Sequence, residues 1–342
     1  HLACLWFFGY CCCRYFTEDR AYAAVFGLAL LQIHPYFSIF GWPTTSLPTV
    51  LCLALLAVRE FTRLPLPWFF ILGGVLFHGG FNNFYDLLPL LFLRDVCDND
   101  WKYSLKLFCW WIAGYAVGFA AADAIVYIGA HDFIEIAPWR DPRPVRSFAD
   151  FVCNAGKMAG YFRDHVEIFL SRGATVFALA AGLGISLYGW RRRRPELLKL
   201  CLVLGAVILS VYVQTLPIGI KISFRTSFPL YIGALSIFIL AGRTRAKGAA
   251  AVLLCVLAFG LFQDDVRTVD FYYKMTAAFK NEFVKVCGQP GKLSGLRFVA
   301  TNEDMLACQR IIMNREHLEN KLTEGFGSAM RWCPVAQTCG VR

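Results

Sequence analysis

Residues 67–93 read PWFFILGGVLFHGGFNNFYDLLPLLFL, and this stretch decides how the chain folds. Both of its ends are apolar, and its middle holds an imidazole, two amides, a phenol and a carboxylate: His78, Asn82, Asn83, Tyr85 and Asp86. A helix needs roughly 20 apolar residues to cross a bilayer core about 30 Å thick. These 27 residues are too many for one span and too few for two spans with a loop. They predict a tight or re-entrant hairpin, or one long helix broken at Gly79-Gly80.

The polar middle of this stretch has two interpretations. Polar groups at membrane depth cost several kcal/mol, and irregular backbone survives there only where protein or a wet cavity satisfies it. The first interpretation is therefore a working site inside the membrane domain. The second is a wet surface turn between two spans. We favour the site because His78 and Asp86 flank the two amides.

The composition is that of a multi-pass helical membrane protein. The 342 residues are 57% apolar and 17% charged, with a mean hydropathy of +0.50. The net charge of +10 lies in short loops between apolar runs. This distribution is typical of membrane proteins, whose cytoplasmic loops carry an excess of Lys and Arg. We therefore expect a lipid bilayer and no nucleic acid as partner. Because His1 opens the chain within an apolar run, we expect the true N-terminus to be missing.

Apolar runs along the rest of the chain predict the other spans. Together with the hairpin they make about nine to ten transmembrane or re-entrant helices, each long enough to reach across or into a bilayer. The expected spans are 2–16, 21–41, 46–58, 107–130, 174–190, 200–219, 226–241 and 248–262.

Basic residues in the short loops predict the orientation of these spans. The cytoplasmic loops would carry Arg14, Arg20, Arg59, Arg63, Arg94, Lys102, Lys106, Arg191 to Arg194, Arg243, Arg245 and Lys247. This assignment works only if residues 67–93 return to the side from which they enter. The outer side then holds the turn 41–48, the hairpin tip, the loop 131–172, the segment 221–225 and the tail after Phe262. We expect the Pro- and Arg-rich loop 131–172 to lie on the membrane surface.

The chain divides by composition into a membrane domain, 1–262, and an extracytoplasmic domain, 263–342. Charges become frequent in the second part, a helical pattern covers 266–279, and LRFVAT at 296–301 is typical of a strand. A small α/β domain is expected there. On the outer side its four cysteines, Cys287, Cys308, Cys333 and Cys339, are able to form one or two disulfides of open pairing. The 14 cysteines show no Cys/His ligand spacing, so we expect no metal site.

Two further features are candidates for chemistry. Asp123 is a lone carboxylate within the span 107–130, where it needs a partner or a polar cavity. The alternative is that the Asp123 side chain extends to the membrane surface or pairs with a structural cation. Lys221 and Arg225 are one helical turn apart at the outer boundary, a spacing that suits a lipid-linked phosphate. Interfacial anchoring is the alternative for this pair.

Three segments, taken in order, resemble a known family. They are HPYFSIFGWPTTSLPTVLCLALLAV (34–58), ILGGVLFHGGFNNFYDLLPLLFL (71–93) and KISFRTSFPLYIGALSIFIL (221–240). The order is similar to that of the Gtr-type membrane glucosyltransferases, which modify bacterial O-antigen. QDDVRTVDFYYKMTAAF (263–279) resembles the acidic helix that begins the tail of those proteins.

The resemblance implies an enzyme of the bacterial inner membrane with the C-type fold of membrane glycosyltransferases. It implies transfer of a hexose, glucose, from a polyprenyl-phosphate sugar donor to a glycan acceptor on the outer face, without a cofactor. The family carries its catalytic acid on the first outer loop, which we expect to be missing, and GWPTTSL has no carboxylate to replace it. The candidate catalytic residues are then Asp86, His78 and Asp123, and the candidate substrate-binding residues are Lys221, Arg225, Asn82, Asn83 and Tyr85.

Two other classes stay open. A transporter or flippase for a lipid-linked sugar would use the same cations and Asp123 without bond chemistry, although the chain shows none of the internal repeats that favour transport. An O-antigen polymerase or ligase would act through the basic residues of the outer loop 131–172, namely Arg140, Arg143, Arg146, Arg163 and His165.

Overall fold

The computed structural model describes residues 2–32, 55, 64–78, 82–131, 142–170, 173–220, 222, 224–263 and 266. The chain divides into two compact units, 1–261 and 262–342, and the description below concerns the first. All regular structure among the described residues is helical, as expected for the membrane domain. The predicted turn 41–48, most of the span 46–58 and the predicted α/β domain with its four cysteines lie outside the described residues.

The first two helices, α1 (Leu2–Thr17) and α2 (Arg20–Leu30), form an antiparallel pair. The Asp19 carboxylate accepts a hydrogen bond from the Tyr22 amide and thereby caps α2. A Cβ at Gly27 would lie 2.7 Å from the Trp6 carbonyl, so only glycine allows this close approach. The Trp6 indole donates to the Ala24 carbonyl at 3.3 Å across the same contact.

Residues 67–93 form an antiparallel hairpin within the described residues. Helix α5 (Leu66–His78) is followed by a 3-10 helix, η2 (Asn82–Phe92), and by the short helix α6 (Leu93–Asp98). Phe77 stacks on Phe84 with ring centroids 6.4 Å apart, and Phe69 contacts Phe92 edge-on at 5.2 Å. Because contacts near the tip join residues close in sequence and contacts near the base join distant ones, the chain doubles back. Of the two predicted alternatives, the structure adopts the hairpin.

Helix α7 (Trp101–Ala130) packs on α5 through glycines. A Cβ at Gly74 would overlap the Gly114 carbonyl, and a Cβ at Gly118 would overlap the Gly74 backbone. Small residues four apart let helix backbones approach closely, which is a common mode of helix packing inside membranes. The span begins six residues earlier than the predicted 107, because the Asp100 side chain caps the helix by accepting from the Tyr103 amide.

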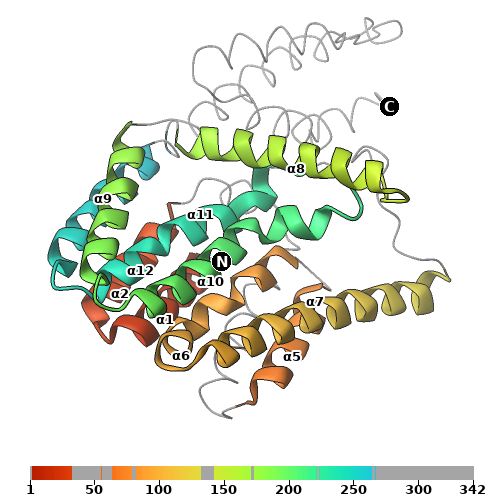
Figure 1. Ribbon diagram of the computed structural model, residues 1–342, viewed down its shortest axis with the longest axis horizontal. Coiled ribbons are helices and arrows are strands. Elements are labelled where there is room, and N and C mark those ends of the chain that lie inside the picture. The colour runs from red at the N-terminus through yellow and green to blue at the C-terminus, as the bar shows by residue number, and fades with distance from the viewer. Residues whose placement is uncertain are drawn as a thin grey trace, which may run out of the picture. The chain divides into compact units, whose positions relative to one another are not determined.

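Helix α8 (Phe148–Phe169) occupies the middle of the predicted loop 131–172. That prediction of a loop was therefore wrong for these 22 residues. Ahead of the helix, the Arg143 amide donates to the Ile218 carbonyl at 2.8 Å and the Val145 amide to the Pro217 carbonyl at 2.9 Å. Figure 1 shows α8 lying along one margin of the first unit, next to α11.

The remaining elements are α9 (Gly173–Gly189), α10 (Arg194–Thr215), η4 (Phe224–Ser227), α11 (Phe228–Leu235), α12 (Ile237–Gly242) and the helix Lys247–Gln263. Helices α9 and α12 run in parallel: the Ser186 hydroxyl donates to the Ile237 carbonyl at 3.1 Å and the Trp190 indole to the Leu240 carbonyl at 3.1 Å. The predicted span 226–241 is interrupted at Ser236, whose hydroxyl donates back to the Ile232 carbonyl at 2.8 Å.

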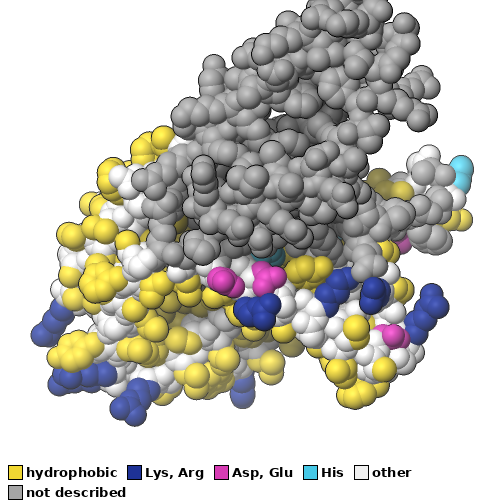
Figure 2. All heavy atoms as spheres, turned by 90° about the horizontal axis from the view of Figure 1, so that it is seen from above, with side chains coloured by type: hydrophobic (Ala, Val, Ile, Leu, Met, Phe, Trp, Pro, Cys, Tyr) yellow, Lys and Arg dark blue, Asp and Glu magenta, His cyan; other side chains and the backbone are white. Residues whose placement is uncertain are grey.

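Two described helices are long and apolar enough to cross a membrane, Trp101–Gly129 and Arg194–Thr215. The other apolar helices described are shorter, between 10 and 17 residues. Only 11% of the most apolar window of α7 is buried, so α7 is not the core helix of a soluble fold. Hydrophobic side chains also make up much of the described surface in Figure 2. An apolar surface of this extent marks contact with a membrane or a partner.

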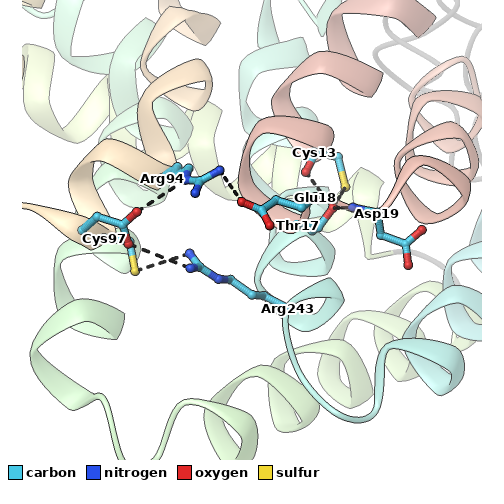
Figure 3. A network of polar contacts seen from close by, with 8 residues as sticks. Cys13, Thr17, Glu18, Asp19, Arg94, Cys97 and Arg243 are labelled. Atoms are coloured by element: carbon cyan, nitrogen blue, oxygen red, sulfur yellow. Dashed lines mark hydrogen bonds and ion pairs between the residues drawn. The ribbon is translucent and has the colours of Figure 1, made fainter.

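Three of the segments with predicted cytoplasmic basic residues or their neighbours, 17–19, 94–98 and 243–247, are joined by ion pairs, and Figure 3 shows Glu18, Arg94 and Arg243 of this network. Arg94 pairs with Glu18 at 2.5 Å, and Arg243 lies 3.9 Å from Asp98. Lys247 pairs with Asp19 at 2.6 Å. The Asp19 carboxylate accepts hydrogen bonds from Lys247 and from the Tyr22 amide, and both bonds hold the pKa of this carboxyl below its usual value. Residues 17–19, 94–98 and 243–247 therefore share one end, as the charge pattern requires.

Candidate functional site

Asp86 lies at the opposite end of the unit, within η2, and its carboxylate is fully buried. Gln214, the penultimate residue of α10, donates its side-chain amide to Asp86 Oδ1. Ser210, one turn earlier on α10, sits close to the same carboxylate and donates its proton to the Val207 carbonyl at 2.8 Å. Asp86 Oδ2 has no hydrogen-bond partner among the described residues. A buried carboxylate oxygen without a donor is costly, so it marks a place where a ligand donor would be stabilised.

The hairpin tip also contacts the start of α11. Phe84 and Phe228 have ring centroids 4.9 Å apart, and Asn83 beside Phe84 is buried. Phe228 follows η4 directly, and η4 contains the backbone of Arg225. The structure thus brings the tip of the hairpin next to the segment that was predicted to bind phosphate. Lys221 and the side chains of Arg225 and Asn82 lie outside the described residues.

Tyr85 is directed to the other side of η2, toward α7. Its hydroxyl donates to the Trp111 carbonyl at 2.6 Å, and the Trp111 indole donates to the Tyr85 carbonyl at 3.4 Å. The Tyr85 side chain is fully buried. These two bonds hold the hairpin against α7, and the contact of Tyr85 with substrate stays a prediction.

His78 ends α5 beneath the same tip. Its Nδ1 lies 2.9 Å from the Gly74 carbonyl, and because a carbonyl only accepts, Nδ1 carries the hydrogen. The ring meets Tyr115 edge-on with centroids 4.5 Å apart. Nε2 is buried without a described partner and is an acceptor in this tautomer. His78 therefore offers a second acceptor atom near the hairpin tip, on the side of α7.

Asp123 is a separate candidate, on α7. It is half-buried on α7, roughly 33 Å along the helix axis from Trp101 at 1.5 Å per residue. The interfacial and the paired interpretations of Asp123 both stay predictions.

Helix α8 holds the segment after α10 in place. The Asn154 side-chain amide donates to the Arg143 carbonyl at 2.8 Å and to the Leu216 carbonyl at 3.1 Å. The Lys157 ammonium donates to the carbonyl of Gly219 at 2.7 Å, and Gly219 has a φ of +65° that favours glycine. These contacts fix the chain immediately before Lys221. Asn154, Lys157 and Gln214 were not predicted from the sequence as members of this region.

His165, a candidate of the polymerase hypothesis, is buried between α8 and α10. Its Nδ1 lies 2.8 Å from the Tyr212 hydroxyl, and the Tyr231 hydroxyl donates to its carbonyl at 3.3 Å. Burial lowers the pKa of His165 to about 4, so the ring is neutral at pH 7. A buried, neutral and hydrogen-bonded imidazole is a packing residue of α8 and is poorly placed to meet a polysaccharide.

Comparisons of the chain with known protein families, curated proteins and solved structures find no match. Within the described part of the chain, no three His, Cys, Asp or Glu side chains gather in a way that would hold a metal ion. The described cluster consists of the buried Asp86, the amide side chains of Asn83 and Gln214, and the Phe84 ring that contacts Phe228.

Proposed function

We propose that this protein is a multi-pass membrane glycosyltransferase of the bacterial inner membrane, acting on its outer face. It moves a hexose, glucose in the closest analogy, from a polyprenyl-phosphate sugar to a cell-surface glycan such as O-antigen. The observation that carries the proposal is the position of Asp86. Its unpaired carboxylate oxygen lies on the hairpin whose Phe84 contacts Phe228, three residues after Arg225, and at the end opposite the Arg94 and Arg243 ion pairs.

The chemistry divides between these groups. The acceptor hydroxyl attacks the anomeric carbon, its proton passes to a base, and the bond from that carbon to the lipid phosphate oxygen breaks. Lys221 and Arg225 would stabilise the negative charge of the departing phosphate. Asp86 Oδ2 would accept a hydrogen bond from a sugar hydroxyl and orient the hexose. The general base is not assigned to a residue of this chain.

The charge distribution supports the orientation. The end that carries Arg94, Arg243 and Lys247 is proposed to face the cytoplasm. The Asp86 end and the residues after Phe262 would then face the outer side. About nine to ten transmembrane or re-entrant helices remain the proposed total, of which the described part of the chain contributes two of full spanning length.

The test uses the protein in liposomes with a radiolabelled polyprenyl-phosphate hexose and a lipopolysaccharide acceptor. We expect label to become covalently attached to the glycan, and we expect Lys221→Ala and Arg225→Ala to lose at least tenfold in initial rate while folding normally. Arg163→Ala is the matched control, because Arg163 is a strongly exposed cation elsewhere in the chain. Wild-type turnover by both folded variants would remove the phosphate-binding role. Label that crosses the bilayer but stays on the lipid would make the protein a flippase.

A further inference from the structure

Helix α8 has one buried face and one exposed apolar face. Asn154, Met158 and His165 are buried against the ends of α10 and α11. In the first half of the helix the other face exposes Phe148, Phe151 and Val152, with Phe148 81% exposed. Phe148 and Phe151 stack on each other with ring centroids 6.3 Å apart. Exposed aromatic rings on an amphipathic helix are typical of helices that lie in the interface of a bilayer.

The depth of this half of α8 agrees with such a position. Asn154 and Lys157 bond to the carbonyls of Leu216 and Gly219, just after α10 ends at Thr215. The 22 residues of α10 span about 33 Å along the helix axis. This length slightly exceeds the thickness of a bilayer core, which is about 30 Å. If Arg194 marks one membrane boundary, the residues after Thr215 reach the headgroup layer on the other side. The first half of α8 lies at that level.

The charges near Phe148 fit a phosphate-bearing surface. Arg143 and Arg146 are exposed just before the helix begins. The acidic residue of the first turn, Asp150, is engaged internally: its Oδ2 accepts from the Ser147 hydroxyl at 2.7 Å and from the Arg146 amide at 3.1 Å. Arg143, Arg146 and Asp150 together carry a net charge of +1 next to two aromatic rings, which favours anionic headgroups above an apolar layer.

We propose that the first half of α8, from Arg143 to Val152, binds the outer leaflet of the bilayer, with Phe148 and Phe151 inserted between lipid headgroups. The proposal rests on α10 crossing the membrane as described above. Its consequence concerns position: through Asn154 and Lys157, the lipid-bound helix holds the chain before Lys221 at the depth where a lipid-linked phosphate lies.

The test adds one tryptophan to the full chain and measures its fluorescence as the difference between the variant and the wild-type protein. Phe148→Trp is the probe, with Phe151→Trp as a second position in case the first variant folds poorly. The vesicles contain phosphatidylcholine and phosphatidylglycerol, with or without bromine on the upper acyl chain. Phe177→Trp is the reference, because Phe177 is 67% exposed on the apolar helix α9. Acrylamide in the aqueous phase measures access from water.

We expect the Phe148→Trp emission to be quenched by brominated lipid and to be protected from acrylamide. Adding Arg143→Ala and Arg146→Ala should reduce the lipid quenching at least twofold in the anionic vesicles. Acrylamide quenching without lipid quenching would overturn the proposal and leave the face in water. Protection from both quenchers would also overturn it, because protein would then cover the face. If Phe177→Trp is quenched and Phe148→Trp is not, only this proposal fails; if neither is quenched, the membrane placement fails with it.

Discussion

Asp86 of the hairpin accepts a hydrogen bond from Gln214 of α10, although 128 residues separate the two in the chain. The bond joins the tip of a returning hairpin to the last turn of a helix long enough to cross a membrane. It leaves the second oxygen of Asp86 buried without a described donor. The pair therefore ties the hairpin in place and at the same time presents an acceptor beside the segment that leads to Phe228.

Replacing Gln214 with leucine should destabilise the protein more than replacing both partners. Gln214→Leu removes the donor to Asp86 Oδ1 and leaves the Ser210 hydroxyl as the neighbouring donor, at a cost of about 1–3 kcal/mol. Asp86→Leu combined with Gln214→Leu removes both polar groups and should recover most of that loss. The comparison is made by thermal unfolding of detergent-solubilised protein. A double variant less stable than Gln214→Leu would show that the pair contributes net stability.

The contact between α5 and α7 should depend on glycine. Gly118→Ala places a methyl group where the Gly74 backbone lies, so the helices must separate, at a cost of about 1–3 kcal/mol. Gly129→Ala on the same helix is the matched control, because a Cβ there meets no atom within 4 Å. We expect Gly129→Ala to be neutral or slightly stabilising, since alanine is the better helix former. Equal melting temperatures for the two variants would argue against the observed packing.

The docking of α8 should weaken in acid. The pKa of His165 is about 4 in the folded protein and about 6.5 in an unfolded chain, so the unfolded state binds the proton first as the pH falls. The stabilisation from the neutral ring is complete above pH 6.5 and declines toward pH 4. Between pH 7.5 and pH 4.5 we expect a loss of roughly 2–3 kcal/mol from this residue. Neighbouring groups that face the ring are Asp164, Tyr212 and Tyr231.

His165→Gln supplies the control for that experiment. Glutamine keeps a hydrogen-bonding side chain but does not titrate, so the difference in pH dependence between wild type and variant isolates His165. Unfolding is followed in detergent by near-ultraviolet circular dichroism at several pH values. Identical slopes would mean that the ring does not become charged on unfolding.

The two ends of the unit should lie on opposite sides of the membrane. Lys102→Cys adds a thiol near the Arg94 end, and Arg163→Cys adds one on α8; both positions are exposed. In right-side-out vesicles a membrane-impermeant polyethylene glycol maleimide should add one label to Arg163→Cys beyond the wild-type background. Lys102→Cys should gain its label only after the vesicles are permeabilised. Labelling of both from outside would contradict the hairpin topology within a membrane.

The hairpin was predictable because two independent constraints agree on it. The length of 67–93 excludes one ordinary span and also two, and the basic loops require the stretch to return. The ion pairs of Arg94 with Glu18 and Arg243 with Asp98 confirm that these loops share one end. The conformation of η2 was not predictable, because an 11-residue 3-10 helix containing Pro89 is rare and depends on its packing between α5 and α10.

Helix α8 was missed because its prolines and charges are typical of a loop. Pro138, Pro142 and Pro144 all precede the helix and mark its boundary instead of preventing it. Asn154 and His165 look like surface residues in sequence, yet both are buried once α8 lies against α10. Gln214 was missed for a related reason. A single amide in VYVQTL shows no distinguishing pattern until Asp86 is brought beside it by folding.

The most direct test compares Asp86→Asn with Asp98→Asn for hexose transfer in liposomes. Asparagine has the shape of aspartate and keeps an oxygen for Gln214, but it places an NH2 donor where the unpaired acceptor oxygen lies. Asp98, at the other end, is a half-exposed partner of Arg94 and serves as the matched carboxylate. We expect Asp86→Asn to transfer about tenfold to hundredfold more slowly, as the loss of a buried hydrogen-bond acceptor predicts, while Asp98→Asn stays near wild type. Full transfer by a folded Asp86→Asn variant would contradict the assignment of Asp86 to the sugar.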